Sequence, residues 1–113
     1  MCGIFAAWDP INCLRIKKGD LDNLLKHRGP DSQNLSFCKK NQLHLYHSRL
    51  KIIDISDDAN QPFTSTSNRY EIIFNGEIYN YDELIKEHNI TLTTNSDCEV
   101  ILHLYKKYKI SVW

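Results

Sequence analysis

The second residue of the chain is a cysteine that could act as a nucleophile through its own amino group. Methionine before a residue as small as Cys2 is normally removed, which would leave a thiol and a free α-amine on one residue. Such an amine has a pKa of roughly 7.7 to 8.0, so part of it is neutral at physiological pH and can accept the thiol proton. The alternative is that Cys2 is a small buried residue of a strand, and from Cys2 alone that alternative is favoured.

Asn75 and Gly76 form a pair that suits two different structures. Asn-Gly after an apolar strand is usually a tight turn. The same pair suits an oxyanion hole, since Asn75 offers a side-chain amide N–H and Gly76 offers a backbone N–H that no side chain blocks. Glu77, the next residue, could bind a cationic group.

Two further charged residues could contact a ligand. Arg49 could bind a carboxylate through two parallel hydrogen bonds, although a surface position is the simpler interpretation. Asp97 could bind a cation, although an acidic residue at the beginning of a helix is also favoured by the helix dipole. Each residue is ambiguous by itself, and the functional interpretation gains weight only because all of them occur together in one order.

Composition and charge exclude several classes of protein. The chain has 113 residues with 14 basic and 14 acidic side chains, so it lacks the basic surface that nucleic acid requires. No apolar run approaches the roughly 18 residues that span a bilayer, and the apolar residues 2–8 lack the positive leader of a secretory signal. We therefore expect a cytoplasmic protein that binds neither nucleic acid nor membrane. The four cysteines contain no Cys-x-x-Cys pair and are expected to be free thiols rather than metal ligands.

The elements that must position these residues are predicted from apolar spacing. Strands are predicted at 2–8, 43–47, 52–55 and 70–74, helices around 21–25 and at 80–88 and 97–108, and a loop at 56–68. The helix at 97–108 has the clearest signal, because Ser96 and Glu99 form a capping-box pattern before an apolar stripe. This order of elements predicts an α+β fold.

Six short motifs occur in one order along nearly the whole chain. They are Met1-Cys2-Gly3-Ile4-Phe5, His27-Arg28-Gly29-Pro30-Asp31, His47-Ser48-Arg49-Leu50, Gln61-Pro62-Phe63, Asn75-Gly76-Glu77-Ile78-Tyr79-Asn80 and Ser96-Asp97-Cys98-Glu99-Val100-Ile101-Leu102. In this combination the chain resembles class II glutamine amidotransferases, the glutaminase domains of the N-terminal-nucleophile hydrolase fold. Leu50 after the arginine and the Glu-Ile-Tyr-Asn stretch after Gly76 are similar to the asparagine-synthetase type within that class.

The resemblance implies a role for each site residue. Cys2 would attack the side-chain amide carbon of glutamine while its own amine moves the proton, and Asn75 and Gly76 would hold the oxyanion. Arg49 would bind the α-carboxylate of glutamine. The α-ammonium group would be bound by Glu77 and Asp97. Ammonia would leave, and water would release glutamate from the thioester, with no cofactor and no metal in this half-reaction.

The resemblance also implies a longer parent protein. The glutaminase domain of the family is a four-layer αββα sandwich that is longer than this chain, so residues 1–113 are expected to be its N-terminal part and to form a partial sandwich. In the family a synthetase domain that uses ATP and magnesium to amidate aspartate follows. That domain is missing from the chain and would be a partner in cis or in trans. The loop before Gln61-Pro62 departs from the family, which usually has a glycine where this chain has Ala59 or Asn60.

Three functions remain open at this point. The first is a glutaminase unit that supplies ammonia to a synthetase domain. The second is an inactive truncated remnant or interaction module that keeps the motifs without the complete fold. The third is an amidotransferase of the same class with a different ammonia acceptor.

Overall fold

Two antiparallel sheets and the helices beside them make up the structure, a computed structural model that describes residues 1–112. Sheet A has the strand order β1-β3-β2, and sheet B pairs β4 with β5. The elements in chain order are β1 (Gly3–Trp8), α1 (Lys18–Leu25), β2 (Ser32–Cys38), β3 (Leu43–Arg49), β4 (Phe63–Thr64), β5 (Glu71–Ile72), α2 (Tyr81–His88), α3 (Cys98–Tyr108) and the 3-10 helix η1 (Lys109–Val112). Within residues 1–112, no helix has the length and apolar character needed to cross a bilayer.

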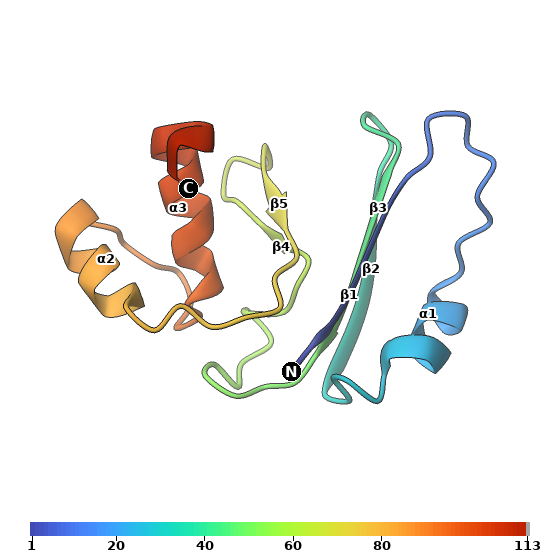
Figure 1. Cartoon of the computed structure of the whole chain (residues 1–113), viewed down its shortest axis with the longest axis horizontal. Helices are drawn as coiled ribbons and strands as arrows, with labels where there is room; N and C mark the ends of the chain where they lie inside the picture. The colour runs from blue at the N-terminus through green and yellow to red at the C-terminus, as the bar shows by residue number, and fades with distance from the viewer. Residues whose placement is uncertain (113) are drawn as a thin grey trace.

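One face of sheet A is covered by α1 and the turn that follows it (Figure 1). Tyr46, which is fully buried on β3, donates its hydroxyl hydrogen to the carboxylate of Asp22 on α1 at 2.9 Å. Ser48, on the same face of β3, donates to the carbonyl oxygen of Gly29 at 2.7 Å. A Cβ atom at Gly29 would lie 2.1 Å from the Ser48 carbonyl oxygen, so only glycine allows this approach. These contacts fix the central strand β3 from one side.

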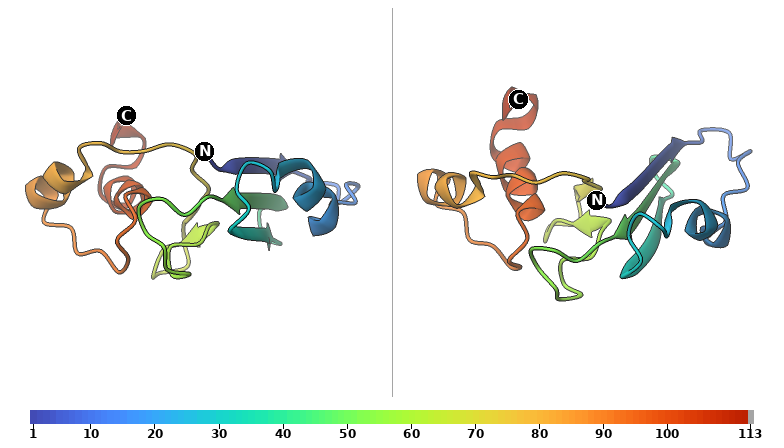
Figure 2. Two further views of the ribbon diagram at one scale, coloured as in Figure 1. Left: turned by 90° about the horizontal axis from the view of Figure 1, so that it is seen from below. Right: turned by 60° about the horizontal axis from the view of Figure 1, so that its bottom comes forward.

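The opposite side of sheet A faces sheet B, and α3 and α2 lie beyond sheet B (Figure 1). Helix α3 buries Val100, Leu102 and Leu104, which are 0%, 7% and 9% exposed. The N-terminus of the chain lies between the two halves of the molecule, next to the segment that joins β5 to α2 (Figure 2). Met1 and Cys2, just before β1, are therefore brought close to residues more than seventy positions later, which line the same cavity.

The structure is α+β, as predicted, and several of its elements were predicted from apolar spacing. The predicted strands at 2–8 and 43–47 correspond to β1 and β3, and the predicted helices at 80–88 and 97–108 correspond to α2 and α3. The helix predicted around residues 21–25 is α1, which begins earlier, at Lys18. All four cysteines are free thiols.

The predicted strand at 52–55 is wrong, because these residues form an irregular loop. The carbonyl oxygens of Asp54 and Ser56 accept hydrogen bonds from the Arg49 side chain instead of pairing with a strand. Ile52 and Ile55 are 70% and 77% exposed, so the apolar run does not mark a buried strand.

Three strands also differ from the prediction. Strand β2 (Ser32–Cys38) was not predicted, because its apolar alternation is limited to Leu35 and Phe37; it forms by pairing along its whole length with β3. Strand β4 (Phe63–Thr64) lies within the predicted loop at 56–68. Strand β5 covers only Glu71–Ile72 of the predicted 70–74.

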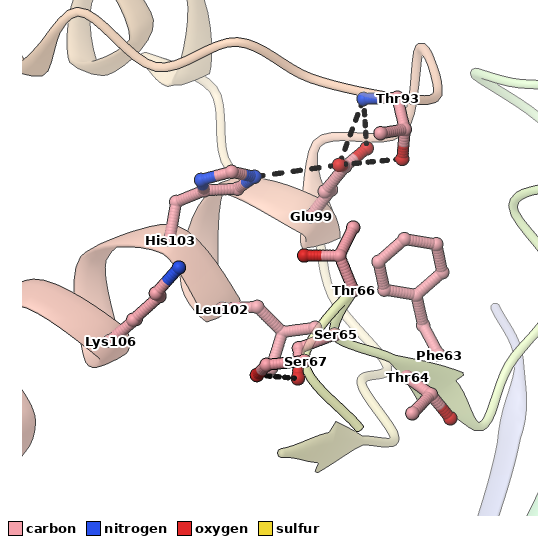
Figure 3. A pocket seen from close by; sticks show the side chains of 10 residues that line it. All are labelled: Phe63, Thr64, Ser65, Thr66, Ser67, Thr93, Glu99, Leu102, His103 and Lys106. Atoms are coloured by element: carbon pink, nitrogen blue, oxygen red, sulfur yellow. Dashed lines mark hydrogen bonds and ion pairs between the residues drawn. The ribbon is translucent and has the colours of Figure 1, made fainter. Parts of the chain in front are cut away.

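The predicted capping box at Ser96 and Glu99 is also wrong. The Glu99 carboxylate accepts the backbone N–H of Thr93 at 2.9 Å (Figure 3). It also accepts that of Thr94 at 2.8 Å, and it does not accept that of Ser96. The Ser96 hydroxyl donates to the Cys98 sulfur at 3.2 Å. Glu99 is 2% exposed, so its carboxylate anchors the preceding loop from inside the protein instead of capping the helix.

Candidate active site

Cys2 lies where the beginning of β1 meets the end of β3. The antiparallel register pairs Gly3 with Ser48, so the preceding residue, Cys2, lies beside Arg49 and Leu50. The backbone N–H of Leu50 donates to the Cys2 sulfur at 3.3 Å. Cys2 is only partly buried, and its sulfur is within 3.8 Å of the Leu50 carbonyl oxygen. The thiol is thus held against the backbone of β3 while it stays accessible from the cavity described below.

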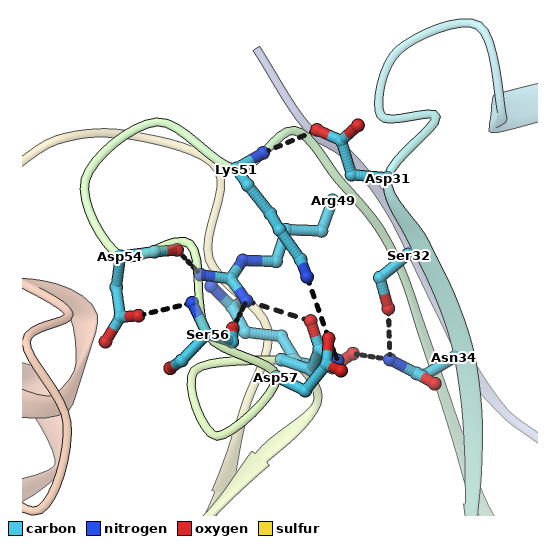
Figure 4. A network of polar contacts seen from close by, with 10 residues as sticks. Asp31, Ser32, Asn34, Arg49, Lys51, Asp54, Ser56 and Asp57 are labelled. Carbon is cyan, nitrogen blue, oxygen red and sulfur yellow. Dashed lines mark hydrogen bonds and ion pairs between the residues drawn. The ribbon is translucent and has the colours of Figure 1, made fainter.

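Arg49 is a buried cation whose partners are neutral groups (Figure 4). It is 5% exposed, and Nη1 donates to the Ser56 carbonyl oxygen at 2.7 Å and to the Asn60 side-chain oxygen at 2.8 Å. Nη2 donates to the Asp54 carbonyl oxygen. Within residues 1–112 no carboxylate forms an ion pair with this guanidinium. A buried positive charge without a directly bonded carboxylate is costly, so this position favours the binding of an anion from outside.

Asp97 is a buried acid at the beginning of α3, and its side chain does not cap that helix. Its carboxylate accepts the backbone N–H of Ile78 at 2.8 Å, and the residue is 6% exposed. This bond joins α3 to the segment before α2. An interaction with the helix dipole alone therefore does not account for Asp97, since its carboxylate is hydrogen-bonded to the Ile78 backbone.

Asp54 links the loop that binds the Arg49 guanidinium to the segment just before α3. Its carboxylate accepts the backbone N–H groups of Ser56 and Asn95, each at 2.8 Å. The hydrogen bonds from Ser56, which outweigh the effect of burial, hold the pKa of Asp54 below its ordinary value, and the Asn95 amide and the Arg49 guanidinium act in the same direction. Asp54 thus fixes the position of Arg49's loop relative to Asp97.

Asn75, Gly76 and Glu77 lie in an irregular segment after β5. Within the described residues, the side chains of Asn75 and Glu77 have no recorded hydrogen-bond partner, so their polar groups are available to a ligand. The residue before them, Phe74, is held by two buried side chains. Gln61 Oε1 accepts the Phe74 N–H at 2.6 Å, and His47 Nε2 lies 3.2 Å from the Phe74 carbonyl oxygen.

One cavity of about 370 Å³ brings all six predicted site residues together. Its lining includes the cysteine, the arginine, the Asn-Gly pair and both acids: Cys2, Arg49, Asn75, Gly76, Glu77 and Asp97. This volume lies in the range of small-molecule sites. Met1 also lines the cavity and is 73% exposed, and removing it would expose the Cys2 amine there. Among residues 1–112 no group of three His, Cys, Asp or Glu side chains is arranged to hold a metal ion.

The comparison with known families agrees with the order of motifs. The model of the glutamine amidotransferase domain family matches residues 1–112. The chain belongs to this family. Two plant proteins are 39% identical to the matched part of the chain. One is named a glutamine-hydrolysing root asparagine synthetase, from Pisum sativum, and is matched over 96% of this chain; the other is named a glutamine-hydrolysing asparagine synthetase, from Arabidopsis thaliana, and is matched over 97%.

The relatives are longer than this chain, and one of them is named for a different activity from the other two. The chain spans 19% of the length of each of these two asparagine synthetases. A protein named an amidase, from Gibberella zeae, is 37% identical over 79% of this chain, which spans 14% of that relative. Similar sequences therefore occur in proteins that are named for different activities.

The sequence motifs include two residues that contact the backbone of this candidate site, without indicating a role for them, and do not include a third. His47 and Gln61 stand in the quoted motifs, but their contacts with Phe74 cross 27 and 13 positions of sequence. Asp54 was placed in a predicted strand, whereas its carboxylate contacts Asn95, 41 positions away. Side-chain bonds to distant backbone follow no period in the sequence, so no pattern could have shown them.

Proposed function

We propose that the chain is a glutamine-hydrolysing unit that releases glutamate and ammonia through a Cys2 thioester. The observation that supports this proposal is that a thiol, a buried unpaired guanidinium, two acids and an Asn-Gly pair line one cavity. A free amino acid with an amide side chain needs an anion site, a cation site and an oxyanion site near the nucleophile. The three kinds of site are supplied here by Arg49, by Glu77 with Asp97, and by Asn75 with Gly76.

The reaction begins once Met1 is removed, because the α-amine of Cys2 is otherwise part of a peptide bond. That amine accepts the thiol proton as Sγ attacks the side-chain amide carbon of glutamine. The carbonyl oxygen becomes an oxyanion that accepts hydrogen bonds from the Asn75 side chain and the Gly76 backbone N–H. The amine then returns the proton to the leaving nitrogen, and the C–N bond breaks to give ammonia and a thioester.

Water completes the cycle. The amine accepts a proton from the water as its oxygen attacks the thioester carbon, and the same donors hold the second oxyanion. The C–S bond breaks, the sulfur takes back a proton, and glutamate leaves. Arg49 holds the α-carboxylate throughout, and because its own hydrogen-bond partners are neutral, the incoming carboxylate supplies the direct ion pair that Arg49 lacks.

We further propose that the ammonia serves an asparagine-forming synthetase domain, in the same longer chain or in a partner, that uses ATP and magnesium to amidate aspartate. The support is the similarity to proteins named glutamine-hydrolysing asparagine synthetases. In the same proposal, residues 1–113 form the N-terminal part of a four-layer αββα sandwich, an arrangement compatible with α1, sheet A, sheet B and α3 lying in that order (Figure 1). The similarity to an amidase keeps a different acceptor open.

An interaction module without glutaminase activity has one observation in its favour. Ile4 and Trp8, on the face of β1 turned away from α1, are 46% and 71% exposed. An exposed apolar strand face is typical of a surface that contacts another protein segment. The two functions differ in one measurable property, because an interaction module would bind without turning over glutamine.

The test is the release of glutamate and ammonia from glutamine by the purified chain, with and without Met1, with asparagine as the control substrate. We expect equal amounts of both products, only after Met1 is removed, and none from the Cys2→Ala variant. Release that is unaffected by Cys2→Ala, or no release from the processed chain, would contradict the proposal.

A further inference from the structure

We propose that His47 and Gln61 are positioning residues for the oxyanion site, because together they hold the peptide groups on both sides of Phe74. The inference rests on the proposed function, in which Asn75 and Gly76 receive the oxyanion. The peptide that contains the Phe74 N–H is held by Gln61 Oε1 at 2.6 Å. The peptide that contains the Phe74 carbonyl, and with it the Asn75 N–H, is held by His47 Nε2 at 3.2 Å.

These side-chain bonds replace a strand ladder. Strand β5 ends at Ile72, and within the described residues no strand pairs with residues 73–76. A segment without ladder partners would ordinarily be mobile. Here the backbone on both sides of Phe74 is fixed by side chains instead, which also explains why the predicted strand at 70–74 stops short.

Both side chains are themselves held firmly. His47 is 0% exposed and lies on β3, the central strand of sheet A. Gln61 is 7% exposed; its side-chain Nε2 donates to Cys98 Sγ at 3.6 Å, and its backbone carbonyl oxygen accepts from the Asn34 side chain at 3.2 Å. The two side chains therefore tie Phe74 to the strand that carries Arg49 and to the helix end that carries Asp97.

The chemistry of His47 suits a fixed donor and does not suit a proton shuttle. A carbonyl oxygen only accepts hydrogen bonds, so Nε2 must carry the hydrogen. Burial lowers the pKa of His47 to about 4, so the ring is neutral at physiological pH. Its Nδ1 is buried and has no hydrogen-bond partner within residues 1–112. His47 does not line the cavity, and the one hydrogen bond of its ring among the described residues is the bond to Phe74.

The consequence for catalysis is specific. Oxyanion donors act on the charge that develops in the transition state, so a small displacement of Asn75 and Gly76 lowers kcat more than it changes substrate binding. Glutamine would still be bound by Arg49, Glu77 and Asp97, none of which contacts His47 by a recorded hydrogen bond. Loss of the His47 donor is therefore expected to lower kcat by about 10- to 100-fold and to leave KM for glutamine within about threefold.

The test compares His47→Leu with a rescuing variant and a matched control. His47→Gln carries an amide N–H at a similar reach to Nε2 and should restore the bond to Phe74. His44→Leu removes another buried histidine of β3, on the opposite face, whose ring nitrogens have no hydrogen-bond partner among the described residues. Each 113-residue chain is measured after removal of Met1, for kcat and KM with glutamine and for hydrogen exchange of the Phe74 amide by NMR.

We expect His47→Leu to lower kcat as stated and to speed Phe74 amide exchange by about tenfold or more, because the peptide group on the other side of Phe74 is no longer held. His47→Gln should return both values to within about fivefold of wild type, and His44→Leu should leave kcat unchanged. Gln61→Met, which removes the acceptor of the Phe74 N–H, should show the same pattern as His47→Leu.

Several results would overturn the inference alone. The first is an active His47→Leu variant with unchanged kcat or unchanged Phe74 amide exchange. The second is an equal loss of kcat in His47→Leu and His44→Leu. The third is a His47→Gln variant that is as impaired as His47→Leu. A wild-type chain that releases no glutamate would instead overturn the proposed function and, with it, the catalytic role of both residues.

Discussion

The backbone N–H of Leu50 donates to the Sγ of Cys2 across 3.3 Å. This contact places the thiol one residue away from Arg49, at the point where β3 leaves sheet A. The proposed nucleophile and the proposed carboxylate site are therefore set by the same strand end. The effects of substituting the two residues can be distinguished by experiment. In the proposed function Cys2 acts on the reacting amide carbon, whereas Arg49 binds the α-carboxylate at the other end of the substrate.

Replacing Arg49 with lysine should raise KM for glutamine by about 10- to 100-fold. The guanidinium holds the carbonyl oxygens of Asp54 and Ser56 and the side chain of Asn60, and a single ammonium cannot keep these bonds and also bind a carboxylate in two places. The loss corresponds to about 1.4 to 2.8 kcal/mol. Steady-state kinetics over a range of glutamine concentrations would measure it.

Lys51→Met is the matched control for that variant. Lys51 is a basic residue two positions along that pairs with the exposed Asp57 and does not line the cavity. We expect its KM to stay near the wild-type value. An Arg49→Lys chain that binds glutamine as well as the control would refute the assigned carboxylate site.

Asp97→Asn and Asp97→Ala should separate charge from structure. Asparagine keeps an oxygen that can accept the Ile78 N–H but loses the negative charge, so KM should rise about tenfold or more while the free energy of unfolding changes little. Alanine also leaves the Ile78 N–H without its partner, which should lower the free energy of unfolding by about 1 to 3 kcal/mol. Glutamine titration and urea denaturation give the two quantities. Unchanged glutamine binding in Asp97→Asn would argue against an ammonium site there.

Gly29→Ala should destabilise the fold, whereas Gly19→Ala should not. A Cβ at Gly29 would lie 2.1 Å from the Ser48 carbonyl oxygen, so the backbone of β3 must shift, at a cost of about 1 to 3 kcal/mol. A Cβ at Gly19, on α1, meets nothing within 4 Å, and alanine favours helix by roughly 1 kcal/mol. Urea midpoints measured side by side would test the pair. Equal midpoints for the two variants would mean that the turn at Gly29 does not pack on β3 as described.

The free energy of unfolding should fall as the pH is lowered from about 6.5 towards 4, through the titration of His47. Burial lowers its pKa to about 4 in the folded chain, below the value of about 6.5 in the unfolded chain. In this window the unfolded chain binds more protons, so this contribution is fully present above 6.5 and is lost as the pH falls, by up to about 1.4 kcal/mol per pH unit.

The comparison that isolates this effect is wild type against His47→Gln, since both chains carry the same acids. Urea denaturation from pH 4.5 to 7.5 should show the wild type losing stability relative to the variant as the pH decreases. Parallel curves over that range would mean that His47 is not buried in its neutral form.

The parts of the fold that could be predicted from the sequence are those in which a period in the sequence matches the exposure of side chains. Helix α3 is an example, since Val100 and Leu104 are spaced by one helical turn and both are buried. Strand β2 could not be predicted, because its residues are mostly polar and its structure comes from pairing with β3. The apolar run at 52–55 misled the prediction because the Arg49 guanidinium binds the backbone carbonyl oxygens of Asp54, within the run, and of Ser56, just after it.

The candidate site divides in the same way. The six site residues could be named from motifs and their order, and all six are among the residues that line one cavity. Their chemical roles stay predictions. The contacts of His47, Gln61 and Asp54 could not be predicted, because each links a side chain to a backbone group far away in sequence. Geometry of this kind depends on the folded arrangement of several elements and leaves no spacing signal in the chain.

The most direct test of the account is the intact mass of the chain before and after treatment with a diazoketone analogue of glutamine. The account predicts loss of Met1 and a single adduct on Cys2, blocked by excess glutamine and absent from Cys2→Ala. An adduct on the exposed Cys13 that glutamine does not block, or a processed chain that takes up no label, would contradict the claim that the cavity beside Cys2 is a glutamine site.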